Sequence, residues 1–304
     1  MQIMSLITAL PGAAAQGLIW GIMAIGVYIT FRILDIADLT VDGTLCTGGA
    51  VCIMMMLSGH NVWVSMLVAT GAGLLAGLAT GIFHTFMGIP AILAGILTQL
   101  SLYSINLKIM GKANQAINVD KFNLLVSLRR VKGVALPQNT LFIVAIMIII
   151  LIAVLYWFFG TELGCSLRAT GCNPSMSRAQ GINTDRNKVL GLMLSNGLVA
   201  LSGALLTQYQ GFADINMGRG SIVIGLAAVI IGEAIFSRIF RNFALKLLSV
   251  VFGSILYYLV LQIVIWMGID TDLLKMLSAL VVAFFLAFPY WKGKYFTKAK
   301  QGGK

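Results

Sequence analysis

Long apolar runs separated by short polar segments organise the whole chain. Because about 20 helical residues cross a hydrocarbon core about 30 Å thick, each run is long enough to span a bilayer as a helix. Backbone polar groups find no water inside lipid, which leaves the helix as the spanning element. The pattern predicts an all-α polytopic membrane protein with about nine transmembrane helices, of which the seventh is the shortest and is broken or tilted. The nine runs lie at about 13–31, 41–58, 62–83, 89–107, 140–160, 187–209, 220–236, 243–267 and 272–290.

Composition agrees with this interpretation. Hydrophobic residues make up 59% of the 304 residues and charged residues 10%, whereas a soluble domain is roughly 25% charged. We expect a single transmembrane domain over residues 1–304, surrounded by the lipid bilayer. Residues 1–15 lack the basic stretch of a cleavable signal peptide, so we expect this segment to be retained.

The most polar interruption is a loop at residues 162–188, and it carries helix signals of its own. Asn173 is a favourable N-cap, Pro174 suits the first helical position, and Gly181 ends the turn in the left-handed conformation. A helix as short as 174–180 is marginal in water, so a partner protein should hold it. We predict a cytoplasmic docking helix, made by Asn173, Pro174, Ser175, Met176, Ser177, Arg178, Ala179, Gln180 and Gly181.

The distribution of lysine and arginine sets the expected orientation. Both the docking loop and the tail at 291–304 are basic, which places them in the cytoplasm under the positive-inside rule. The N-terminus is then outside and the C-terminus inside. The loop at 108–139 is also basic, although nine spans put it outside. Either a span is miscounted or the loop has a reason of its own to be basic, and we favour the second because both flanking spans are well defined. A basic external cap would suit an acidic patch on an extracellular partner; the alternative is a solvated loop.

The net charge of +11 lies mostly in loops and tail beside the bilayer, where anionic headgroups are the expected counter-charge. We therefore predict no nucleic-acid partner. Four cysteines lack the spacing of a zinc ribbon and are expected to stay reduced, and no metal site is expected.

Two segments resemble each other across the chain: ADLTVDG at 37–43 and ADINMGRG at 213–220. Each follows one long span and opens another, the first on the cytoplasmic side and the second outside. Inverted repeats of this kind are typical of transporters and mark the pathway. The pathway candidates are Asp38, Asp42, Gly43, Asp214 and Asn216.

Intramembrane acids are functional by default, but these lie near span ends, where water, helix N-termini and Arg32 can satisfy them. Gly71, Gly73, Gly77 and Gly81 are expected to let helix backbones approach closely. The chain has no Walker A sequence and no nucleophile or zinc-protease motif, so we expect no enzymatic activity.

A family resemblance is carried by RATGCNPSMSRAQGINTDR at 168–186, LSGAL at 201–205 and GFAD at 211–214. These segments are similar to permease subunits of bacterial ABC importers of the branched-chain amino acid and ribose type. DIADLTVDG at 35–43, IPAILAGILT at 89–98 and YSINLKIMG at 103–111 are similar to a subgroup linked to uptake of aromatic amino acids such as tryptophan and tyrosine.

The resemblance implies a multi-pass protein of the bacterial plasma (inner) membrane that forms the translocation pathway for an amino acid. It implies that the short helix fits a groove on a cytoplasmic ABC ATPase dimer, which binds the ATP and Mg; this chain needs no cofactor. It further implies a second permease copy, which we expect to form a homodimer, and an extracellular substrate-binding protein or lipoprotein.

A second function class stays open at this point. The chain could instead be a self-sufficient secondary transporter or channel that uses its intramembrane acidic residues. The docking loop discriminates between the two, because a secondary carrier has no need of it.

Overall fold

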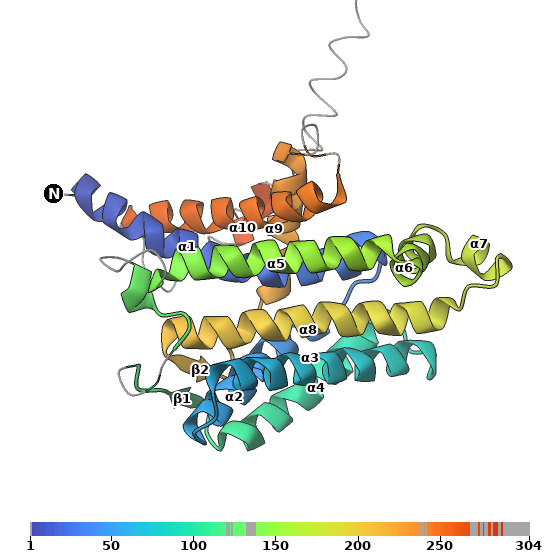
Figure 1. Ribbon diagram of the computed structural model, residues 1–304, viewed down its shortest axis with the longest axis horizontal. Helices are drawn as coiled ribbons and strands as arrows, with labels where there is room; N and C mark the ends of the chain where they lie inside the picture. The colour runs from blue at the N-terminus through green and yellow to red at the C-terminus, as the bar shows by residue number, and fades with distance from the viewer. Residues whose placement is uncertain are drawn as a thin grey trace, which may run out of the picture.

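The computed structural model describes residues 2–119, 122, 124–131, 138–236, 240, 242–267 and a few positions between 273 and 287. Long helices lie side by side in a bundle (Figure 1). In chain order the elements are α1 (Gln2–Tyr28), η1 (Ile29–Ile33), α2 (Thr40–Leu57), α3 (Val62–Thr85), α4 (Ala91–Met110), β1 (Asn114–Ala116), η2 (Leu128–Val131), α5 (Thr140–Gly160), α6 (Glu162–Cys172), α7 (Pro174–Ala179), α8 (Thr184–Gln210), β2 (Phe212–Asp214), α9 (Ser221–Phe236) and α10 (Phe243–Trp266).

Eight of the nine predicted runs coincide with helices, and the all-α membrane fold is confirmed. Among the described residues, seven helices are long and apolar enough to cross a membrane. The seventh predicted run is α9, which at 16 residues is short, as expected. The ninth run, 272–290, lies largely outside the described residues, so nine spans stay a prediction. The first run does not end at residue 31: α1 continues as a π-helical turn, η1, as far as Ile33.

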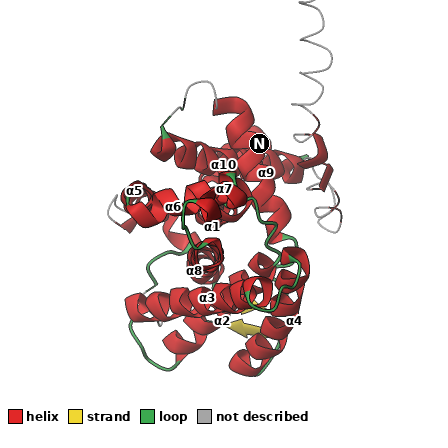
Figure 2. Cartoon of the chain, turned by 90° about the vertical axis from the view of Figure 1, so that its right-hand side faces the viewer, coloured by secondary structure: helices red, strands yellow, loops and turns green. Residues whose placement is uncertain are grey.

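Helix α8 is the centre of the bundle. It packs against α1, α2 and α3, and Figure 2, seen from the end that carries α7, shows it between α1 and α3. Gly73, Gly77 and Gly81 of α3 lie so close to α8 that a Cβ would meet its backbone or Val189, whereas Gly71 has open space around it. The predicted close approach is confirmed for three of the four glycines, because a row of residues four apart lies on one helix face.

The two ends of the bundle differ. Helix α7 lies at one end, and the N-terminus with β1 and β2 lies at the other (Figure 1). The strands pair antiparallel, with Asn114 opposite Asp214. The described part of the basic loop packs onto this end: Leu124, Val126 and Val131 are buried, and Arg129 stays exposed. The described part of the loop is therefore a folded cap, because its apolar side chains are removed from water.

Candidate functional site

The predicted docking helix forms as α7. The side chain of Asn173 accepts a hydrogen bond from the Met176 backbone N at 3.0 Å, and Pro174 takes the first position. Helix α7 ends at Ala179, with Gln180 as its C-cap, one residue earlier than predicted. Gly181 has φ +80, the left-handed conformation that glycine adopts without strain.

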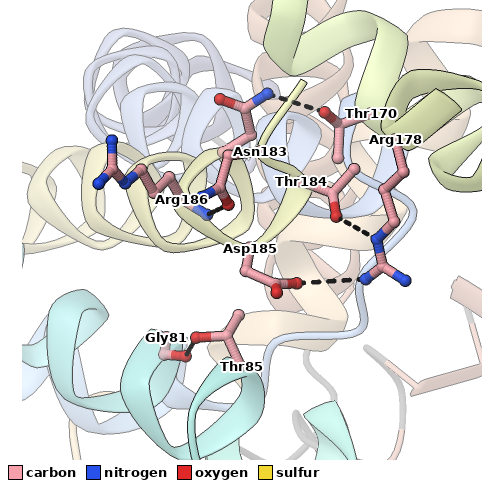
Figure 3. Close-up of polar contacts among 9 residues, drawn as sticks. Gly81, Thr85, Thr170, Arg178, Asn183, Thr184, Asp185 and Arg186 are labelled. Carbon is pink, nitrogen blue, oxygen red and sulfur yellow. Dashed lines mark hydrogen bonds and ion pairs between the residues drawn. The ribbon is translucent and has the colours of Figure 1, made fainter. Parts of the chain in front are cut away.

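The outer face of α7 is free of contacts from the rest of the described chain. Ser177 is buried, whereas Met176 is 58% exposed and Ala179 is also exposed. Figure 3 shows how the inner side is attached: Arg178 donates to Thr184 Oγ1 at 2.7 Å and forms an ion pair with Asp185 at 3.3 Å. Both partners belong to the first turn of α8, so α7 is held in place on a long buried helix and presents its other face to solvent.

Helix α6 packs against η1 and the irregular segment that follows it. Gly171 lies against the Ile33 carbonyl and Leu34, where a Cβ would clash. The Asn187 amide of α8 donates to Ser166 Oγ at 2.6 Å and to Thr170 Oγ1 at 2.8 Å, which fixes α6 on α8. A displacement of α7 would therefore be transmitted through packed backbone to the end of η1.

The chain between η1 and α2 is irregular, and alternate residues of it, Leu34, Ile36 and Asp38, are buried. Asp38 is 2% exposed; its Oδ1 accepts from the Thr40 backbone N at 2.9 Å, and its Oδ2 accepts from Asn196 Nδ2 at 2.7 Å. Asn196 in turn accepts from Thr44 Oγ1 at 2.7 Å. A further chain of hydroxyls runs from Thr40 through Thr80 to Thr98. This network satisfies a carboxyl group that would otherwise be costly to bury.

Asp42 has a different role. It accepts from the backbone N of Gly220 at 2.9 Å, from Ser221 Oγ at 2.8 Å and from the backbone N of Ile222 at 3.0 Å. It thus caps the N-terminus of α9, where a negative charge also meets the positive end of the helix dipole.

The two repeated segments therefore meet. The first copy follows η1, beside α6, and the second follows β2 at the opposite end of the bundle. Both segments run back into the bundle, where the Gly220 backbone N donates to Asp42. That they turn on opposite sides of the membrane stays a prediction. The inverted repeat itself stays a prediction.

A pocket of about 390 Å³ lies where these segments meet α4. The predicted residues Asp42 and Gly43 line it, and Asp38 does not. Asp214 ends β2 and Asn216 lies in the turn that follows, where the Asn216 backbone N donates to Asp214 Oδ1 at 2.7 Å. The full lining is Asp42, Gly43, Cys46, Gln99, Leu100, Tyr103, Asn106, Ile215 and Arg219.

Sequence reasoning missed the contribution of α4 to this pocket. Gln99, Tyr103 and Asn106 are spaced four and three residues apart, which puts them on one face of a helix. Polar residues at helical spacing within an apolar run are the signal that would have found them. Asn196, in the middle of the 187–209 run, was overlooked in the same way.

Two other ionisable groups near span ends have protein partners, as the sequence analysis expected. Glu233 forms an ion pair with Arg32 at 2.9 Å. His84 Nδ1 lies 2.9 Å from the Ile89 carbonyl. The four cysteines are free thiols; Cys46 and Cys52 are buried, and Cys165 and Cys172 are exposed.

The chain resembles known transport proteins over most of its length. It is 39% identical to the tyrosine transport system permease protein of Clostridioides difficile over 90% of this chain and 88% of that one. It is 26% identical to a fructose import permease protein of Bifidobacterium longum over 81% of this chain and 67% of that one. The solved structure of PsaBC from Streptococcus pneumoniae in complex with Fab shares the fold, with TM-score 0.56 and 17% identity over 98% of this chain and 99% of that one.

The family model described as the branched-chain amino acid transport system permease component matches residues 10–286. Together with the multi-pass helical bundle, this match shows that the chain belongs to the family of branched-chain amino acid transport system permease components.

Proposed function

We propose that the chain is the membrane-spanning subunit of an ATP-driven importer for an aromatic or other hydrophobic amino acid, and that it supplies no chemistry of its own. A partner ATPase dimer in the cytoplasm would bind ATP and Mg and hydrolyse the nucleotide. The observation that carries the proposal is α7: a short helix, capped at Asn173, anchored on α8 through Arg178 and exposed on its outer face.

The anchoring explains how such a helix would couple. Closure of the ATPases would displace α7. The displacement would reach η1 through α6, because Gly171 of α6 packs directly against the Ile33 carbonyl. The irregular segment after η1 leads to Asp38 and Asp42, so its movement would shift the segments that surround the 390 Å³ pocket. Alternating access would follow from two arrangements of these segments.

The substrate class is supported by the tyrosine transport permease that is 39% identical to this chain. Exposed apolar side chains on α4, such as Leu93 and Leu97, leave a face for a second copy. A homodimer that encloses the pathway, with an extracellular binding protein or lipoprotein delivering the amino acid, completes the proposal. The end with α7 would face the cytoplasm and the end with β1 the outside.

The test is reconstitution. The purified chain, its co-purifying ATPase and the co-encoded binding protein are placed in liposomes, and uptake of labelled L-tyrosine is followed with and without ATP. ATP-dependent uptake supports the proposal. Uptake that needs an ion gradient and no ATPase would overturn it in favour of a secondary carrier.

A further inference from the structure

We propose that the pocket between α2, α4 and the turn at 215–220 is a substrate-binding site, and that it takes a single α-amino acid with a hydrophobic side chain. The inference rests on the proposed function and adds to it the place and the chemistry of recognition. Its basis is one cavity of about 390 Å³ whose lining includes the buried side chain of Asn106, with an unpaired Oδ1, and the exposed Arg219.

Asn106 is the strongest of these groups. Its side chain is 1% exposed; the amide N donates to the Gly43 carbonyl at 3.4 Å, but Oδ1 accepts no hydrogen bond within the described chain. A buried acceptor without a donor is unfavourable, and such groups are rare in folded proteins. A ligand with an N–H group directed at Oδ1 would satisfy it, and an ammonium group is such a donor.

Asp42 lines the same pocket and is engaged in part. Its Oδ1 accepts from Ser221 and Ile222, and its Oδ2 accepts only from Gly220. A carboxylate offers about four acceptor positions, so a substrate ammonium can bind Asn106 Oδ1 together with Asp42 Oδ2.

Arg219 supplies the complementary group. It is exposed, and it forms no ion pair among the described residues. A guanidinium presents paired N–H donors that match a carboxylate. A ligand that carries both an ammonium group for Asn106 and a carboxylate for Arg219 is an α-amino acid.

The remaining wall is apolar and aromatic. Leu100 and Tyr103 of α4 and Ile215 of the turn line the cavity, and Tyr103 presents a ring that a hydrophobic side chain can cover. Small-molecule sites are about 300–1,000 Å³ in volume, so a cavity of this size accepts one amino acid. Polar groups at the depth of a span also need water or a ligand beside them, which fits a position on the pathway.

Thiol protection tests the site directly. In the reconstituted complex, Cys165 and Cys172 are replaced by serine and Leu100→Cys is introduced at the rim of the pocket. L-tyrosine should slow maleimide labelling of this thiol several-fold, and tyramine, which lacks the carboxylate, should have a much weaker effect. Ser104→Cys is the control, because it is exposed on the same helix and does not line the pocket; tyrosine should not protect it.

Two further variants keep the test decisive if Leu100→Cys does not fold. Arg219→Gln should raise the KM for L-tyrosine uptake at least about tenfold, and Arg219→Lys should restore part of the loss. Asn106→Leu should also raise the KM, because it removes the acceptor for the ammonium group.

The failures are distinguishable. If the unmodified complex imports L-tyrosine with ATP, yet labelling is unprotected and the Arg219 variants keep the normal KM, the pocket is not the site and the proposed function stands. If the unmodified complex neither retains an ATPase nor imports an amino acid, the proposed function itself fails.

Discussion

The carboxylate of Asp42 in α2 holds the beginning of α9, with Oδ2 2.9 Å from the backbone N of Gly220. The same carboxylate receives the hydroxyl of Ser221, 179 residues away in the chain. A cap that is normally supplied by the residue just before a helix is supplied here by another span. The contact joins the first and second halves of the molecule beside the central pocket.

Replacing Asp42 by alanine should destabilise the protein by about 1–3 kcal/mol, because a helix cap is lost and buried donors at the start of α9 lose their acceptor. The midpoint of thermal unfolding in detergent should fall. Asp35→Asn is the matched control: Asp35 is exposed with φ 55, a conformation that asparagine also adopts. Equal midpoints of thermal unfolding for Asp42→Ala and the unmodified protein would show that the cap does not stabilise the protein.

Ala179→Asp should abolish retention of the ATPase while leaving expression and membrane insertion intact. Ala179 is exposed on α7, so the substitution costs the isolated subunit little, but an unpaired charge in a buried contact costs about 3–5 kcal/mol. Co-purification of the ATPase and substrate-stimulated ATP hydrolysis are the measurements. Gly181→Val should act similarly, because a β-branched residue resists φ +80.

The control for this pair is Ala169→Asp, the same exchange at an exposed position of α6 outside the docking helix at 173–181. It should keep the ATPase. Transport at the normal rate in both Ala179→Asp and Gly181→Val would mean that no ATPase docks at α7.

Thiol labelling should report the orientation. Cys172 and Cys165 are exposed, and an impermeant maleimide should reach them only from the cytoplasmic side. Cys46 and Cys52, which are 2% and 0% exposed, should react slowly from either side. Single-cysteine variants assign the signals, and labelling of Cys172 in intact cells would reverse the proposed orientation.

The charge of the basic cap should matter for docking of the binding protein more than for folding. Two basic residues of this loop are unsuitable for the test. Lys132 lies outside the described residues, and Arg130 donates to the Leu124 carbonyl at 2.9 Å, which ties it to the fold. The better variant is Lys112→Glu with Arg129→Glu, since both side chains are exposed. It should weaken association most at low salt, where screening is least.

Arg186→Glu, an equal exchange at the exposed beginning of α8 near the other end of the bundle, should leave this association unchanged. If the cap variant binds as tightly as the unmodified chain at low ionic strength, the cap has no electrostatic role in docking.

The sequence by itself determined the elements that depend on local physical chemistry. The apolar runs predicted eight helices that the structure contains, because lipid demands about 20 apolar residues in a row. Asn173, Pro174 and Gly181 predicted the limits of α7 to within one residue, since capping involves only neighbours along the chain. The family was also readable, because its docking-loop motif is contiguous.

Only the tertiary structure decided which of the polar residues work together. Asp38 and Asp42 occur in one short motif, yet Asp38 bonds to Asn196 while Asp42 caps α9. Asn106 and Arg219 line one pocket because the fold places α4 beside the turn at 215–220. The reason is that these partners are about 60 to 180 residues apart, and the sequence carries no local signal for such contacts; the packing of α2 and α8 creates them, and through them the pocket.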